Sequence, residues 1–172
     1  MGKIEITKKV LGICATNCYT VVDTETKEAL IIDPADRADV LIRDWKDKGV
    51  TPTAVLLTHG HFDHIGALAG VKKEYPDIKV YAAAEEKEVM ESPALNLSSS
   101  FGAAFTAQAD IYLEDGAEIE VLGRKCKCLL VPGHTKGGMC YYFPEEHVVF
   151  TGDTLFCYSV GRTDFPTGDA KA

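Results

Sequence analysis

Three of the five histidines of this chain lie within six consecutive residues, His59-Gly60-His61-Phe62-Asp63-His64. Neutral imidazole is the commonest protein ligand for zinc and similar metals, and a carboxylate often accompanies it. Helix capping could explain Asp63, but it gives no reason for three imidazoles. The segment therefore predicts a metal site. His59 and His61, two apart in an extended stretch, can point the same way, whereas Asp63 and His64 face elsewhere and could reach a second ion.

Two later loops carry further candidate ligands, His134 in Pro132-Gly133-His134-Thr135 and Asp153 in Gly152-Asp153-Thr154. Each follows an apolar strand end, and each has a glycine beside it that lets the backbone turn. Either loop alone is typical of an ordinary turn. Together with the first loop, they indicate that three segments meet at one metal site. The remaining histidine, His147, opens a predicted strand and is expected to be an ordinary residue.

The elements that must position these loops follow from the apolar pattern. The unbroken run 54–57 before the first loop predicts a strand buried on both faces. A helix is predicted from Ala38 to a stop at Gly49, and a second over 65–75, which Pro76 ends. Further strands are predicted over 4–10, 19–23, 29–32, 79–82, 117–122, 125–131, 139–143 and 147–151, with a short helix over 85–90. The last two strands are expected to form a hairpin, and residues 92–110 a connection rather than a lid.

Composition limits the function. A chain of 172 residues predicts one domain over 1–172, and its net charge of -8 argues against nucleic-acid and anionic-membrane surfaces. The expected partner is a small-molecule substrate, with no nucleic acid and no membrane. No apolar run is long enough for a signal peptide or a bilayer span, and the six cysteines show neither zinc-ribbon nor paired CxxC spacing. These features predict a cytoplasmic protein with reduced thiols.

The HxHxDH loop, the PGHT loop and the TGDTLF segment, in this order, resemble the metallo-β-lactamase superfamily. Residues 151–169, TGDTLFCYSVGRTDFPTGD, are similar to the small single-domain glyoxalase-II-like (hydroxyacylglutathione hydrolase-like) enzymes. The resemblance implies an α+β fold, a four-layer αββα sandwich with metals at one edge of its two sheets. It also implies the ligand sets: His59, His61 and His134 for a first metal, Asp63 and His64 for a second, and Asp153 between them.

One element of the family pattern is missing. Members carry a further histidine some tens of residues beyond the GRTDFP segment, together with a last strand and helix, and this chain ends at Ala172. Two explanations follow: a chain that is C-terminally incomplete relative to the family, which we favour, or a second metal site that is weak or empty. The expected cofactor is zinc, as two ions, with iron or manganese as alternatives.

The predicted activity is hydrolysis by a metal-bound hydroxide, because two ions about 3.5–4 Å apart can bring the pKa of a shared water from 15.7 towards 7. Asp63 is expected to be catalytic by orienting that hydroxide. A thioester suits the site, since its thiolate leaving group has a pKa of about 8.5. The resemblance to the glyoxalase-II-like enzymes implies a hydroxyacyl-glutathione or a similar thioester as the substrate. Lys136 and Arg162 could meet an anionic substrate group. For Lys136 we favour the simpler interpretation of a solvated surface charge. For Arg162 an ion pair with Asp164 that holds the terminal loop is an equal alternative.

Two other functions remain open. His59, His134 and Asp153 would form a two-histidine, one-carboxylate face that suits iron(II), which would make the protein a single-iron persulfide dioxygenase on the same fold. Alternatively, the chain is a metal-binding domain without turnover.

Overall fold

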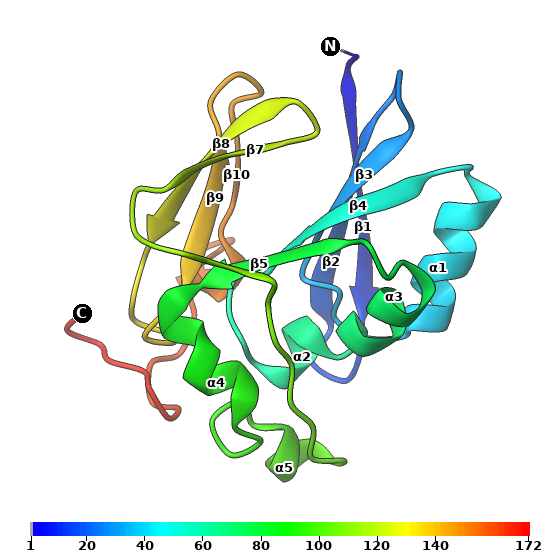
Figure 1. Ribbon diagram of the computed structural model, residues 1–172. Coiled ribbons are helices and arrows are strands. Elements are labelled where there is room, and N and C mark those ends of the chain that lie inside the picture. Colours follow the sequence, from blue (N-terminus) through cyan, green and yellow to red (C-terminus); the bar gives the residue numbers. More distant parts are fainter. Residues whose placement is uncertain (1) are drawn as a thin grey trace.

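Two β-sheets pack against each other in the computed structural model, which describes residues 2–172 (Figure 1). The larger sheet has six strands in the order β1-β2-β3-β4-β5-β6: Ile4–Leu11, Thr16–Asp23, Glu28–Ile32, Thr51–Leu56, Lys79–Ala83 and Ile111–Leu113. The smaller sheet has the order β10-β9-β8-β7, where β7 is Glu118–Val121, β8 Arg124–Leu130, β9 Met139–Phe143 and β10 Val148–Phe150. A separate hairpin joins β11 (Leu155–Phe156) to β12 (Ser159–Val160).

Strand direction brings the ligand loops to one edge. The strands β3, β4, β5 and β6 are mutually parallel, so the loops after β3, β4 and β5 leave the larger sheet on the same side. In the smaller sheet β8 and β10 are both antiparallel to β9, and they therefore run in the same direction. The predicted hairpin of β9 and β10 is confirmed.

Short helices fill the connections. They are α1 (Ala38–Asp47), α2 (Phe62–Ile65), α3 (Leu68–Glu74), the 3-10 turn η1 (Ala84–Glu86), α4 (Lys87–Glu91), α5 (Ser98–Phe101) and the 3-10 turn η2 (Gly152–Thr154). Among residues 2–172, no helix is long and apolar enough to cross a lipid bilayer.

The helix predicted over 65–75 is confirmed over Leu68–Glu74 (α3), but its start is wrong, because Ile65 belongs to α2 and the chain breaks the helix at Gly66 and Ala67. The amide of Ala67 donates to the carbonyl oxygen of Pro34 at 2.9 Å instead of continuing the helix. Gly66 lies so close to the same segment that a Cβ there would be 2.4 Å from the oxygen of Ala35. Packing against the loop after β3 therefore interrupts the local helical pattern.

Strand β4 of the larger sheet is buried on both faces, as the apolar run 54–57 predicted. Val55 and Leu57 pack on the helix side with Leu41 and Trp45 of α1, whereas Leu56 faces the smaller sheet. The inner face of the smaller sheet completes that second core with Cys126, Cys128, Met139, Tyr141 and Phe143. On its outer face Leu129 is 41% exposed and Val149 48% exposed, and no helix of the described chain covers that face.

Candidate metal centre

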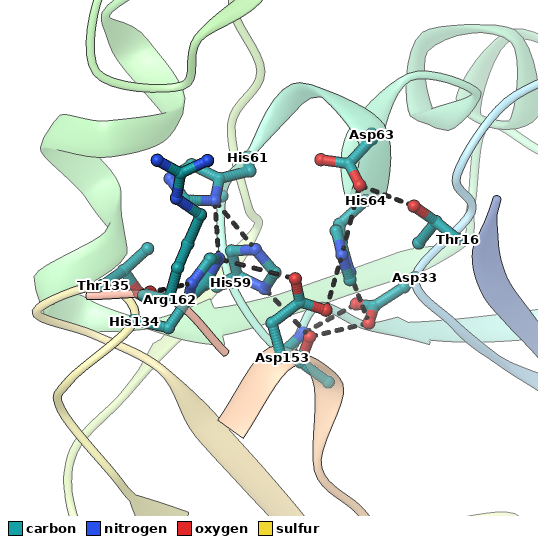
Figure 2. A network of polar contacts seen from close by, with 12 residues as sticks. Thr16, Asp33, His59, His61, Asp63, His64, His134, Thr135, Asp153 and Arg162 are labelled. Carbon is teal, nitrogen blue, oxygen red and sulfur yellow. Dashed lines mark hydrogen bonds and ion pairs between the residues drawn. The ribbon is translucent and has the colours of Figure 1, made fainter. Parts of the chain in front are cut away.

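The three predicted ligand loops meet at one edge of the sandwich (Figure 2). Strand β9 of the smaller sheet holds the end of β4, where the histidine loop begins. The backbone amide of Met139 donates to the oxygen of Thr58 at 2.8 Å, and the hydroxyl of Tyr141 donates to the oxygen of Leu57 at 2.8 Å. The loop therefore leaves a rigid strand end, which is the support that a metal site requires.

His59, His61 and His134 form one tight group. Nδ1 of His61 lies 3.1 Å from Nε2 of His59 and 3.0 Å from Nε2 of His134. The three rings are nearly perpendicular to one another, and all three side chains are buried. Two nitrogen ligands of one tetrahedral zinc ion, each bound at about 2.0–2.1 Å, would lie about 3.3 Å apart. The spacing of these nitrogens therefore fits a shared ion.

The electrostatic surroundings keep two of these imidazoles neutral. Burial, reinforced by the neighbouring imidazoles, holds the pKa of His59 well below its usual 6.5. Burial also lowers the pKa of His61 to about 3, with His134 and His64 contributing. Neutral rings have a free nitrogen lone pair, which is the form that binds a metal.

A second group centres on His64. Its Nε2 lies 3.3 Å from Oδ1 of Asp153 and 3.5 Å from Oδ2 of Asp63. The other oxygen of Asp153 lies 3.6 Å from Nε2 of His134, so this carboxylate stands between the two groups (Figure 2). Nε2 of His64 is buried and has no hydrogen-bond partner, despite its nearness to two carboxylates. Such an atom fits a ligand position for a cation.

Negative charge surrounds this second group. Burial alone would lower the pKa of His64, but Asp33, Asp153 and Asp63 outweigh it and raise that pKa well above 6.5. Burial likewise opposes the charge of Asp153, yet His64 lowers its pKa. Asp63 is held in place by the hydroxyl of Thr16, which donates to its Oδ2 at 2.5 Å.

Asp33, which directly follows the strand predicted over 29–32, orients His64. Its Oδ2 accepts from Nδ1 of His64 at 2.9 Å and from the hydroxyl of Thr58 at 2.6 Å, and its Oδ1 accepts from the amide of Thr58 at 2.7 Å. A carboxylate on the outer nitrogen of a histidine fixes the ring and leaves the other nitrogen for a metal. The available signal was its position, because Asp33 follows an apolar strand as the other site loops do.

Arg162 reaches the site through its backbone rather than its charge. Its carbonyl oxygen accepts from Nδ1 of His134 at 2.7 Å, which leaves Nε2 of that ring facing the other histidines. Its guanidinium forms two hydrogen bonds to Asp164, at 2.6 and 2.7 Å, and lies over the ring of Phe165. The predicted alternative of a pairing with Asp164 is therefore confirmed.

Two other residues considered in the sequence lie outside the centre. Lys136 forms an ion pair with Glu88 on α4. His147 is exposed in the turn before β10.

A cavity of about 980 Å³ opens onto both groups. His61, His64 and Asp153 line it, together with Phe62 and Phe101, whose rings stack with centroids 4.8 Å apart. Phe101 belongs to α5, so the segment 92–110 forms part of the cavity wall. The expectation of a mere connection was wrong, because Leu97 and Phe101 of this segment line the cavity and Phe101 stacks on Phe62 of the histidine loop.

Comparisons with known proteins agree with this geometry. The family model "Metallo-beta-lactamase superfamily" matches residues 11–172. A "Probable metallo-hydrolase YqgX" of Bacillus subtilis is 37% identical over 163 residues, 94% of this chain and 76% of that protein. A "Hydroxyacylglutathione hydrolase GloC" of Haemophilus influenzae is 34% identical over 159 residues, 89% of this chain and 73% of that protein.

Solved structures of other proteins also match this chain over most of its length. The BLEG-1 B3 metallo-β-lactamase superimposes with a TM-score of 0.91 at 39% identity, covering 97% of this chain and 80% of that one. TTHA1623, solved in a di-iron-bound form, gives a TM-score of 0.82 at 35% identity, covering 96% and 80%. With the sandwich fold, the clustered histidines and these matches in agreement, the chain belongs to the metallo-β-lactamase superfamily.

Proposed function

We propose that this protein is a metal-dependent hydrolase that cleaves a thioester, such as a hydroxyacyl-glutathione. The observation that carries the proposal is the meeting of two ligand groups, around His61 and around His64, at one cavity. The 34% identity to a protein named as a hydroxyacylglutathione hydrolase supports the thioester. The volume of the cavity, about 980 Å³, is in the range of small-molecule sites.

In this proposal His59, His61 and His134 hold the first ion, Asp63 and His64 hold the second, and Asp153 contacts both. Bound divalent ions would bring the pKa of a water towards 7 and polarise the substrate carbonyl. The protein contributes neutral, buried imidazoles and two oriented rings, His64 on Asp33 and His134 on the carbonyl of Arg162. Asp63, which lines the cavity, can accept a hydrogen bond from the attacking water and so orient it.

We propose zinc as the ion, since three imidazoles with carboxylates form a donor set typical of zinc. Iron is an alternative, because the related TTHA1623 was solved with two irons. Manganese is a third candidate for the carboxylate-rich second group.

The test is to purify the protein without added metal, measure its metal content, and assay it on S-lactoylglutathione, a lactone and a β-lactam. We expect zinc and selective hydrolysis of the thioester. Asp63→Asn should reduce kcat on the thioester by 10²–10⁴, the range typical of a lost acid–base group. Metal binding without turnover of any of the three compounds would contradict the proposal.

A second candidate is a single-iron persulfide dioxygenase. It is favoured by a two-histidine, one-carboxylate set whose ligand atoms lie within 4.8 Å of one another: His59, His64 and Asp153, with His64 in the place for which the sequence predicted His134. One iron per chain, with oxygen consumed on a persulfide and no thioester hydrolysis, would select it.

A further inference from the structure

We propose that Glu86 is a positioning residue that sets the first ligand group by tying the His59–His61 loop to the His134 loop. The inference rests on the proposed metal centre, but it concerns a residue that binds no ion itself. Glu86 is the last residue of η1, between β5 and α4, and lies outside all three ligand loops.

The carboxylate of Glu86 joins two segments that are far apart in the sequence. Its Oε2 accepts from the amide of Gly60 at 2.6 Å, between the two histidines of the first loop. Its Oε1 accepts from the hydroxyl of Thr135 at 2.6 Å and from the amide of Gly137 at 2.9 Å, one and three residues after His134 in the second loop. One side chain thus fixes the backbone beside all three histidines.

The two loops close tightly onto this carboxylate. A Cβ at Gly60 would lie 2.9 Å from Oε2 of Glu86, and one at Gly137 would lie 2.8 Å from its Oε1. Real Cβ atoms do not approach so closely, so any larger residue would push the loops apart. The glycines therefore serve the same contact as the carboxylate.

Glu86 is fully buried against a packed helix, and its carboxylate contacts uncharged hydrogen-bond donors. Glu86 has no exposed surface, and Val89 and Met90 of the following helix are equally buried. The nearest lysine in the second loop, Lys136, is paired with Glu88 instead. Three hydrogen-bond donors, rather than a cation, thus hold the carboxylate.

This arrangement explains how two separate loops reach the ligand spacing. The distance of 3.0 Å between His61 Nδ1 and His134 Nε2 joins residues on the two loops that Glu86 bridges. Partners that orient ligands from outside the coordination sphere typically change metal affinity 10–100-fold when they are removed. Glu86 therefore belongs to the machinery of the site, although no local sequence motif marks it.

The test is Glu86→Gln, measured by titrating the metal-free protein with Co²⁺ and recording the visible spectrum. The amide keeps the shape of the side chain but turns an NH₂ group towards at least one of the donors. We expect Co²⁺ binding at the first site to weaken 10–100-fold, with a changed absorption spectrum. Thr135→Val should give a smaller loss, and Thr135→Ser, which keeps the hydroxyl, should restore wild-type affinity.

Asp23→Asn is the matched control. Asp23 is also a buried carboxylate that accepts two backbone amides, those of Glu25 and Thr26, but it lies at the opposite end of β2 from Thr16, which contacts Asp63. It should lower thermal stability and leave Co²⁺ affinity and spectrum unchanged. If Glu86→Gln lowered stability but left Co²⁺ affinity and spectrum unchanged, as expected for this control, the proposal would be overturned. Should Glu86→Gln not fold, the same result for Thr135→Val would overturn it.

The outcomes also separate this inference from the proposed function. A wild-type protein that binds Co²⁺ and depends on Glu86, but hydrolyses no thioester, would overturn only the proposed function. If the protein hydrolyses a thioester and Glu86→Gln leaves its Co²⁺ affinity unchanged, only the positioning role would be overturned. A wild-type protein that binds no Co²⁺ would overturn both.

Discussion

At the scale of single residues, the geometry of this site depends on which ring nitrogen of each histidine is hydrogen-bonded to the surrounding protein and which one faces the centre. Nδ1 of His64 donates a hydrogen bond to Asp33, and Nδ1 of His134 donates one to the carbonyl oxygen of Arg162. Both rings therefore present Nε2 to the centre. His61 instead presents Nδ1 to its two neighbours. The ring orientation therefore depends on residues that bind no metal in the proposal.

The two kinds of histidine give the sharpest prediction at this scale. His59→Ala removes a nitrogen from the first group and should abolish binding of one metal ion and all hydrolysis. His147→Ala should do neither, because His147 is exposed in a turn and is not among the residues that line the cavity. Metal content by mass spectrometry and kcat/KM on S-lactoylglutathione would check both. Equal and mild effects of the two substitutions would contradict the ligand assignment.

At the scale of elements, the segment 92–110 is attached to the histidine loop by one asparagine. The backbone oxygen of Asn96 accepts from the amide of Phe62 at 2.8 Å. Its buried side chain donates to the oxygens of Phe105 and Met90 and accepts from the amide of Ser98. Asn96 therefore shapes the segment that carries Phe101 to the cavity.

Asn96→Ala should destabilise the protein by about 1–3 kcal/mol, since it removes the hydrogen bonds of a buried side chain and leaves the amide of Ser98 without that acceptor. Urea unfolding measures the loss, and hydrogen exchange should show faster exchange across residues 96–105. Gln108→Ala is the control within the same segment. Gln108 bonds to Glu91 on the surface, so its loss should change stability by no more than about 0.5 kcal/mol. Unchanged exchange in Asn96→Ala would refute the anchoring role.

At the scale of the whole molecule, a buried ion cluster closes the end of the sandwich opposite the candidate metal centre. Arg124 of β8 is 3% exposed, and it donates to Asp23 of β2 at 2.9 Å and to Glu146 at 2.7 Å. It thereby joins the two sheets. Hydrogen bonds from Thr26, Arg124 and Glu25 lower the pKa of Asp23.

This pKa predicts how stability depends on acid. A group whose pKa is lower in the folded state stabilises the protein above its unfolded pKa, about 3.9, and loses that contribution as pH falls through the folded value. Asp23→Asn should therefore be clearly less stable than wild type at pH 7, and the gap should narrow below about pH 4. Urea unfolding of the metal-free proteins at several pH values measures it.

Asp39→Asn provides the comparison, because its ion pair with Arg37 is exposed on the surface. Surface pairs contribute little, so its stability should follow that of wild type at every pH. A gap for Asp23→Asn that stayed constant down to pH 3 would show that its ionisation is not what stabilises the fold.

The sequence alone determined the candidate ligands, because each stands just after an apolar strand, and strand ends are encoded by local pattern. It also determined the family resemblance and most strands. The tertiary structure decided which side chains meet, how His64 and His134 are turned, and that the segment 92–110 lines the cavity. It alone revealed Glu86, whose contacts with Gly60 and Gly137 span 26 and 51 residues. No helical or strand period carries information over such separations, since these contacts arise only when packed strands bring distant loops to one edge.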